Sequence, residues 1–467
     1  MLAVSLLAAP LAQARGLPKP VADALRAAGV PESAVSIVVQ EVGAARPSLR
    51  LNDAAPMNPA SAMKLVTTYA ALELLGPAYQ WKTEVYTTGT LRDGVLDGDL
   101  VLKGYGDPHL DYESFWLLLR QLRGKGLREI RGDLVLDRSY FAPVAGAPGD
   151  FDGEATRPYN VLPDALLVHY KSIRFVFLPE VESGGVRVYA EPSPPGLQIA
   201  SRLRLWGGHC VDGKAFRSLL EPTFDPGPPP RASFDGLYPT DCGEKDLNVA
   251  FLPPDEHVAG VFGELWREMG GSWSGRTREA AVPEGAALLH TRESAPLAEI
   301  VRDINKYSNN VMARQLFLTL AASGYAPPLT IDESREVVRH WLNLKGIAAP
   351  ELSLDNGAGL SRTDRVSART LAELLESAWR SAVMPEYVAS LPLAGIDGTM
   401  KKRLVGDPVA GQAHLKTGLL ADARSMAGYL LDARGRRQVV VMLMNHPNAP
   451  DADAANDALL RWIYERK

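Results

Sequence analysis

The sequence predicts an α/β (α+β) protein of several domains, in which an antiparallel sheet flanked by helices is interrupted by a large β-rich insertion. The chain has 467 residues, enough for two or three domains. Helical periodicity near both ends gives way, between about residues 83 and 290, to short strands among dense Pro and Gly. We therefore expect residues 15–82 and 291–467 to form one domain, and residues 83–290 to form an insertion of two subdomains.

Composition excludes some classes of protein. Hydrophobic residues make up 46% and charged residues 22% of the chain, which predicts an ordinary buried core rather than disorder. The formal net charge is -5, and there is no basic run. A general nucleic-acid-binding protein should be basic, so no nucleic-acid partner is expected.

The first residues have the features of an export signal. Residues 2–9 are apolar, and Ala12-Gln13-Ala14 fits a small-x-small cleavage site, so residues 1–14 are predicted to be a signal peptide. The usual basic leader is absent, and a frayed apolar terminus is the alternative. No later stretch is long and apolar enough to span a bilayer. We expect a soluble, exported, periplasmic protein without a transmembrane anchor.

The N-terminal part should contain a helix, a hairpin and a second helix. Apolar spacing, alternation and turn residues place them at residues 16–28, at 36–42 paired with 48–52, and at 60–75. Asn58 is suited to cap the second helix, and Pro59 suits its first turn. Gly76-Pro77 is placed to end it.

The insertion contains one internal similarity. The segment Gly98-Asp99-Leu100-Val101-Leu102 recurs as Gly132-Asp133-Leu134-Val135-Leu136, with a helix expected between them at residues 112–122. Two copies do not make a repeat protein, so we interpret them as two related strands of one α+β subdomain. Further strands are expected at residues 172–178, 186–190, 198–205 and 247–251.

The C-terminal part should be helical first and then form strands. Helices are expected at residues 296–304, 311–322, 334–345 and 368–381, strands at 414–419, 426–432 and 438–445, and a closing helix at 454–464. Ala433-Arg434-Gly435 is typical of a tight turn between the last two strands.

The two cysteines, Cys210 and Cys242, leave two possibilities open. In an oxidising compartment they could pair and close a Pro-rich loop at residues 221–231, which would contribute about 3–4 kcal/mol in the chain-entropy model. Two free buried thiols are the alternative. The paired ligand spacing of a zinc site is missing, and neither a metal nor a cofactor is expected.

Ser61-Ala62-Met63-Lys64 is the first candidate catalytic motif. Ser61 falls in the first turn of its predicted helix, and Lys64 lies one turn later on the same face. A hydroxyl and an amine placed in this way can act as a nucleophile and its base, provided that burial or a second cation removes the proton of the amine. A surface lysine beside a capping serine is the ordinary alternative, although no other serine here has lysine at the third position after it.

Two further motifs support the catalytic interpretation. Ser308-Asn309-Asn310 precedes a predicted helix, and Lys416-Thr417-Gly418 lies in a predicted strand. Each is weak alone, because such triplets are usually a loop cap or a plain edge strand. Together, in this order, the three motifs match the set found in penicillin-binding proteins and class A β-lactamases. The combination predicts that Ser61 is a nucleophile.

Other segments make the resemblance specific. They are Gly104–Pro108, Arg157–Asn160, Pro163–Leu166, Asp355–Arg362 and Leu391–Thr399. On these residues the chain resembles, over nearly its whole length, the class C low-molecular-mass penicillin-binding proteins, the D-alanyl-D-alanine carboxypeptidase/endopeptidase family typified by penicillin-binding protein 4. That family carries its large insertion between the first and second motifs, here between Lys64 and Ser308. Class A β-lactamases have no insertion of this size.

The resemblance implies roles for the residues of the three motifs. Ser61 would attack the carbonyl between two D-alanines and form an acyl-enzyme, with Lys64 as its base. Ser308 would relay a proton toward the leaving amine, and Asn310 would contact the substrate amide and Lys64. Lys416 would supply positive charge to the substrate carboxylate and help to keep Lys64 neutral.

The resemblance also implies a substrate-binding strand. Thr417 would hydrogen-bond the substrate carboxylate, and the oxyanion would lie between the backbone N–H groups of Ser61 and Leu419. Many relatives carry Ser or Thr where this chain has Leu419. That change removes a side-chain hydroxyl but keeps the backbone N–H.

An acid, an aromatic residue and an arginine of the family contact the diamino acid side chain of the peptide. The nearest matches here are Glu154, Tyr159 and Arg362. A surface charge, a core aromatic and a loop brace are the respective structural alternatives.

The predicted function is therefore an exported serine DD-peptidase that hydrolyses D-Ala-D-Ala, or D-Ala–diamino acid crosslinks, in peptidoglycan stem peptides, and that β-lactams acylate. A β-lactamase with the same chemistry and a non-catalytic cell-wall-binding protein stay open as alternatives. The sequence does not decide between carboxypeptidase and endopeptidase activity.

Overall fold

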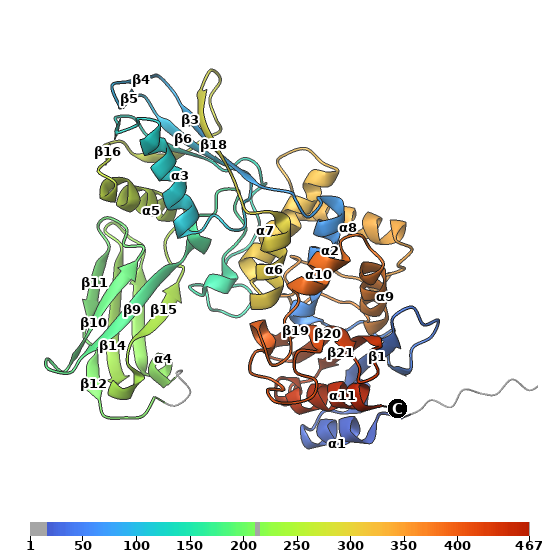
Figure 1. Cartoon of the computed structure of the whole chain (residues 1–467). Helices are drawn as coiled ribbons and strands as arrows, with labels where there is room; N and C mark the ends of the chain where they lie inside the picture. The colour runs from blue at the N-terminus through green and yellow to red at the C-terminus, as the bar shows by residue number, and fades with distance from the viewer. Residues whose placement is uncertain (1–15, 211–214, 467) are drawn as a thin grey trace, which may run out of the picture.

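The structure is a computed structural model that describes residues 16–210 and 215–466 (Figure 1). The predicted signal peptide, residues 1–14, lies outside the described residues. Among the helices described, none combines the length and the apolar character needed to cross a membrane. Mixed helices and antiparallel strands confirm the predicted fold class.

Both ends of the chain build one five-stranded antiparallel sheet in the order β19-β20-β21-β1-β2. Its strands are β19 (Ala413–Leu420), β20 (Ala423–Leu431), β21 (Arg437–Asn445), β1 (Val35–Glu41) and β2 (Leu49–Leu51). β1 pairs with β21 from Val35 opposite Met444 to Glu41 opposite Gln438. The N-terminal hairpin and the three C-terminal strands are thus confirmed, and the sheet joins sequence segments almost 400 residues apart.

Helices cover both faces of this sheet, which explains why β20 and β21 are buried almost throughout. One face packs against α1 (Lys19–Ala27) and α11 (Asp453–Glu465) (Figure 1). The other face packs against a helical layer made of α2 (Lys64–Leu74), α6 (Leu297–Tyr307), α7 (Asn310–Thr319), α8 (Ile331–Leu344), α9 (Ala368–Trp379) and α10 (Met384–Ser390).

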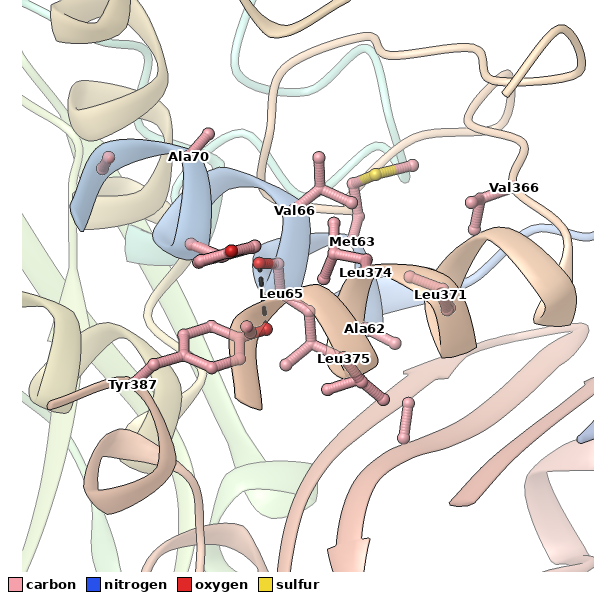
Figure 2. Close-up of a cluster of buried hydrophobic side chains, with 14 of the residues drawn as sticks. Ala62, Met63, Leu65, Val66, Ala70, Val366, Leu371, Leu374, Leu375 and Tyr387 are labelled. Atoms are coloured by element: carbon pink, nitrogen blue, oxygen red, sulfur yellow. Dashed lines mark hydrogen bonds between the residues drawn. The ribbon is translucent and has the colours of Figure 1, made fainter. Parts of the chain in front are cut away.

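Helix α2 is the centre of the helical layer. Every residue from Lys64 to Leu72 is buried, because neighbouring helices and the sheet surround α2 on all sides. Figure 2 shows Leu65 and Val66 among side chains of α9, with Tyr387 of α10 beside them. The Tyr387 hydroxyl donates a hydrogen bond to the carbonyl of Leu65 at 3.1 Å. This packing fixes the helix that follows Ser61.

The start of this helix differs from the sequence prediction. Residues Ala60–Met63 form a 3₁₀ turn, and α2 begins only at Lys64. The N-cap position belongs to Pro59, not Asn58, and no side chain caps it. Asn58 instead accepts a hydrogen bond from the N–H of Ala60 at 2.9 Å, because Ala60 has the left-handed φ of 46°.

The first part of the insertion is a stack of related strand pairs. The predicted similarity is confirmed: β6 (Leu100–Gly104) and β8 (Leu134–Asp137) lie parallel with Leu100 opposite Leu134. Sequence analysis missed a third parallel strand of this set, β17 (Thr277–Glu279), which pairs with β8. The partners β5 (Val95–Asp97), β7 (Glu129–Ile130) and β16 (Ser272–Trp273) stack in the same way. Helices α3 (Tyr112–Gly124) and α5 (Pro254–Glu268) share the hydrophobic core of this stack.

Two outer strands complete this stack and adjoin the helical layer. They are β3 (Lys82–Thr87) and β18 (Ala287–Glu293). The short β4 (Thr90–Arg92) pairs with β5 at the edge of the four-stranded sheet. The predicted domain boundaries at 82/83 and 290/291 fall inside the pair of β3 and β18, in which Lys82 faces Glu293. The division into domains therefore stays a prediction.

The second part of the insertion is a seven-stranded sheet with its own apolar core. It contains β9 (Ile173–Glu180), β10 (Gly185–Glu191), β11 (Gln198–Ser201), β12 (Arg204–Trp206), β13 (Leu220–Asp225), β14 (Arg231–Pro239) and β15 (Lys245–Val249), with α4 (Ala215–Leu219) beside it. The strand expected at 198–205 is broken in two. Cys210 and Cys242 form a disulfide, so the free-thiol alternative was wrong.

The expected Pro-rich loop at residues 221–231 was largely wrong. Most of it is the hairpin of β13 and β14, which pair up to Asp225 opposite Arg231. Only the turn between these two residues contains the run of prolines. Pro222 is tolerated because β13 pairs only with β14 and so forms an edge strand.

Replacing Gly132 by Ala should destabilise the strand stack. A Cβ at this position would lie 2.4 Å from both the carbon and the oxygen of the Gly98 carbonyl, so the backbone would have to move. Overpacking of this kind costs about 1–3 kcal/mol. Gly207→Ala is the matched control, because a Cβ there meets nothing within 4 Å. Thermal unfolding should show a lower midpoint for Gly132→Ala only. Equal midpoints for the two variants would contradict the close stacking.

Candidate active site

Three segments that are distant in sequence meet at one end of α2. Ser61 lies in the 3₁₀ turn before α2, and Asn310 is the first residue of α7. Ser308 ends α6 in the left-handed conformation, with φ 56°. Lys416 lies on β19, the edge strand of the central sheet. The structure thus brings together the three motifs that the sequence singled out.

Lys64 is buried at the centre of this site, with no exposed surface. Its Nζ lies 3.0 Å from Ser61 Oγ, 2.6 Å from Asn310 Oδ1 and 2.5 Å from the carbonyl oxygen of Ala358. All three partners are uncharged oxygens. Within the described residues, no carboxylate pairs with this amine.

The environment of Lys64 favours its neutral form. Burial lowers its pKa well below the usual value, and the positive charges of Lys416 and Arg314 lower it further. Asp364 opposes this effect only weakly, because its own burial raises its pKa to about 7. A neutral amine 3.0 Å from a hydroxyl can accept the proton of that hydroxyl.

Lys416 joins the second and third motifs. Its Nζ donates to Ser308 Oγ at 2.8 Å and to the carbonyl of Thr417 at 2.7 Å. Burial lowers the pKa of Lys416 to about 7. The hydroxyls of Thr417 and Thr399 lie 2.9 Å apart at the exposed rim of the site.

Strand β19 passes unusually close to the backbone of Ser61. A Cβ at Gly418 would lie 2.7 Å from the backbone nitrogen of Ser61, so only glycine fits there. The next residue, Leu419, has a side chain that is 55% exposed. The site therefore has an open face along the free edge of β19.

The glycine-rich turn at residues 355–362 forms the opposite wall. Gly359 has a left-handed φ of 75°, and a Cβ there would lie 1.9 Å from the carbonyl oxygen of Ala60. The turn also supplies the Ala358 carbonyl that contacts Lys64. Sequence analysis quoted this segment for its resemblance but missed the contact, since a backbone carbonyl has no residue-type signature.

The residues predicted to contact a diamino acid side chain are only partly assembled. Arg362 lies over the ring of Phe151, 4.5 Å from the centroid, and 3.5 Å from Asp422. Tyr159 donates its hydroxyl hydrogen bond to Asp152 at 2.9 Å. Glu154 is exposed and pairs with Arg157 instead.

Asp152, the carboxylate that accepts a hydrogen bond from Tyr159, was not singled out by the sequence analysis. Burial acts to raise its pKa, but hydrogen bonds from the Glu154 N–H, from Tyr159 and from Asn160, together with the charge of Arg362, lower it overall. These contacts favour an ionised Asp152 carboxylate, hydrogen-bonded to Tyr159 and within the electrostatic influence of Arg362. In the sequence, only its position seven residues before Tyr159 relates Asp152 to that aromatic residue.

Comparison with protein families now becomes informative. The model of the D-Ala-D-Ala carboxypeptidase 3 (S13) family matches residues 17–465. The chain belongs to this family. It is therefore a serine-type D-Ala-D-Ala carboxypeptidase by class, and the resemblance to the penicillin-binding protein 4 group is confirmed.

Individual relatives agree with the family. The D-alanyl-D-alanine carboxypeptidase DacB of Haemophilus influenzae is 25% identical over 87% of this chain and 84% of its own length. The D-alanyl-D-alanine carboxypeptidase of an Actinomadura species is 28% identical over 87% of this chain and 77% of its own. The crystal structure of penicillin-binding protein 4 from Haemophilus influenzae matches with a TM-score of 0.79 and 24% identity, covering 95% of this chain and 99% of that one. A second structure of that protein, complexed with a β-lactam, matches with a TM-score of 0.73, the same identity and the same coverage of both chains.

Removing the charge of Arg314 should raise the pKa of Lys64. The Arg314 side chain is buried, and its positive charge disfavours a proton on Lys64. Without that charge the ammonium form costs less, so Arg314→Met should shift the Lys64 titration to higher pH and leave that of Lys416 in place. Side-chain ¹⁵N NMR of labelled lysines measures both. Arg302→Met, at an exposed arginine of α6, is the control. An unmoved Lys64 titration would contradict the electrostatic account.

Proposed function

We propose that this family member is an exported serine DD-peptidase that cleaves the D-Ala-D-Ala bond of peptidoglycan stem peptides through an acyl-enzyme on Ser61. The observation that carries the proposal is the 3.0 Å contact between Ser61 Oγ and a fully buried lysine that lacks a carboxylate partner among the described residues. The predicted signal peptide supports export to the periplasm.

The acylation step follows from the chemistry of the contacts. Neutral Lys64 takes the proton of Ser61, and Ser61 Oγ bonds to the substrate carbonyl carbon. The carbonyl oxygen becomes an oxyanion, which the N–H groups of Ser61 and Leu419 would stabilise. The C–N bond then breaks, and Ser308 relays a proton to the leaving amine nitrogen, so D-alanine departs. Water hydrolyses the resulting ester and regenerates Ser61.

Lys416 and Thr417 are proposed to recognise the terminal carboxylate of the substrate. Lys416 is buried, and its Nζ already donates to Ser308 Oγ, so its charge would act between the carboxylate and the proton relay. A bound carboxylate would favour the protonated form of Lys416. The hydroxyl of Thr417 lies at the exposed rim beside that of Thr399, where it can donate to the same carboxylate.

The wall formed by Asp152, Tyr159 and Arg362 is proposed to bind the side chain of a diamino acid in the stem peptide. Asp152 can pair with the ammonium and Arg362 with the carboxylate at the end of such a side chain. Glu154 is replaced in this role by Asp152, which the structure links to Tyr159. A site that binds this side chain would also accept crosslinked peptides as substrates. Endopeptidase activity is therefore part of the proposal.

β-Lactams are proposed to acylate Ser61 in the same way. The penicillin-binding protein 4 of Haemophilus influenzae has been solved with a β-lactam, which supports the proposal for this chain. When the β-lactam amide bond opens, the leaving nitrogen remains part of the molecule that is now bound to Ser61. The leaving group therefore cannot depart, and the acyl-enzyme should persist. Slow, stoichiometric acylation would separate this function from that of a β-lactamase.

The test is to incubate the wild-type protein and Ser61→Ala with labelled penicillin and with purified muropeptides, both crosslinked and uncrosslinked. We expect mass spectrometry to place one penicilloyl group on the Ser61 peptide, and chromatography to show release of D-alanine or cleavage of the dimer by the wild type only. Ser61→Ala should lose both. An unmodified Ser61 peptide in the wild type, or cleavage by Ser61→Ala, would contradict the proposed function.

Asp152→Asn should weaken binding of peptides that carry a side-chain ammonium, because it removes the charge that pairs with that group. Kinetics on peptides with and without the ammonium measure the effect; we expect kcat/KM to fall about tenfold for the former, the size of one charged hydrogen bond. Glu154→Gln is a matched control two residues away, at an exposed carboxylate. If the two variants have equal kcat/KM values on both peptides, Asp152 does not bind the ammonium group.

A further inference from the structure

The three residues before the nucleophile are held by side chains that no motif of the family resemblance includes. Ala60 has no exposed surface and a φ of 46°, a conformation that is unfavourable for a residue with a Cβ. Rotation about Ala60 aims the next N–H, which belongs to Ser61. Other contacts must therefore keep Ala60 in this conformation.

The side-chain amide of Asn445 pairs with the backbone of Asn58. The Asn58 N–H donates to Asn445 Oδ1 at 2.7 Å, and Asn445 Nδ2 donates to the Asn58 carbonyl at 2.9 Å. Asn445 is the last residue of β21, so its side chain extends the hydrogen bonding of the central sheet to the turn. Both bonds together fix the position of the Asn58 backbone.

The side chain of Asn58 continues the network into the site. Its Oδ1 accepts from the N–H of Ala60 at 2.9 Å, and its Nδ2 donates to the carbonyl of Ser361 at 2.8 Å. Asn58 is thus bonded through its backbone N–H, its carbonyl and both side-chain atoms, and only 8% of it is exposed. It ties the nucleophile turn to the glycine-rich turn.

Ser425 holds Pro59, the residue between Asn58 and Ala60. Its Oγ donates to the carbonyl of Pro59 at 2.5 Å and is fully buried. Ser425 lies opposite Gly418 in the pairing of β20 with β19, and a Cβ at Gly418 would lie 2.3 Å from the Ser425 hydroxyl. The hydroxyl therefore reaches Pro59 through the space that Gly418 leaves open.

We propose that Asn58, Asn445 and Ser425 are positioning residues that form a brace for the turn at residues 58–60, holding Ala60 left-handed so that the Ser61 N–H points at the developing oxyanion. This proposal rests on the proposed function, because it assigns that N–H to the oxyanion. None of the three side chains needs to touch the substrate. The brace acts on the transition state through the direction of one backbone donor.

The brace is tested with Asn445→Ala and Ser425→Ala. A misdirected oxyanion donor should lower kcat for D-alanine release, and the rate constant of penicillin acylation, about 10- to 100-fold, with KM changed less than about twofold. Ser36→Ala is the matched control, because Ser36 is also fully buried in the central sheet and donates to a carbonyl, that of Asn52, at 2.9 Å. It should acylate at the wild-type rate.

A substitution at Ala60 separates positioning from general stability. Glycine adopts positive φ without strain, so Ala60→Gly should make the turn less dependent on its brace. We expect Asn445→Ala to lower the acylation rate constant less in the Ala60→Gly background than in the wild type. Thermal unfolding of all variants checks that each is folded at the assay temperature.

Each outcome decides a different point. If the brace variants acylate at the rate of Ser36→Ala while unfolding at lower temperature, the brace is only structural and the inference is overturned. An identical loss in both Ala60 backgrounds also overturns it. If the wild-type protein itself takes up no penicillin, the proposed function fails, not the brace.

Discussion

The site depends on two lysines that are buried without carboxylate partners among the described residues. An ammonium ion loses several kcal/mol of hydration on burial and normally recovers it by pairing. The same protein does this elsewhere: buried Lys306 lies 2.7 Å from Asp397. Lys64 and Lys416 contact only neutral oxygens, and the charge of Lys416 further disfavours a proton on Lys64. Their proton affinity is therefore low. The three oxygens around Lys64 match the two donors and one lone pair of a neutral amine.

The rest of the fold keeps this unfavourable arrangement in place. Helix α2 is packed on all sides, so the Lys64 amine cannot swing out into water. Backbone from the glycine-rich turn and from β19 approaches Ala60 and Ser61 at Gly359 and Gly418, where any side chain would collide with them. The pairing of β1 with β21 joins the N-terminal part of the chain, which carries Ser61, to the C-terminal strands, which carry Lys416. The insertion places Phe151, the residue before Asp152, under Arg362 of the glycine-rich turn.

The sequence predicted the motif residues and most elements because both have local signatures. Periodicity revealed α3, α9 and the strands of the central sheet, and the order of the three motifs predicted the meeting of Ser61, Ser308 and Lys416. What it missed depends on tertiary contacts. The Ala358 carbonyl could be any residue, and the brace residue Asn445 resembles an ordinary strand end. Strand β17 is too short for periodicity, and the contact of Tyr159 with Asp152 rather than Glu154 depends on how the loop folds.

The most direct measurement is a crystal structure of the protein after reaction with benzylpenicillin. The account predicts an ester to Ser61 Oγ, with its carbonyl oxygen about 3 Å from the backbone nitrogens of both Ser61 and Leu419. It also predicts the penicillin carboxylate beside Thr417 and Lys416. Penicillin bonded to another side chain, or an ester oxygen turned away from the Ser61 N–H, would contradict it.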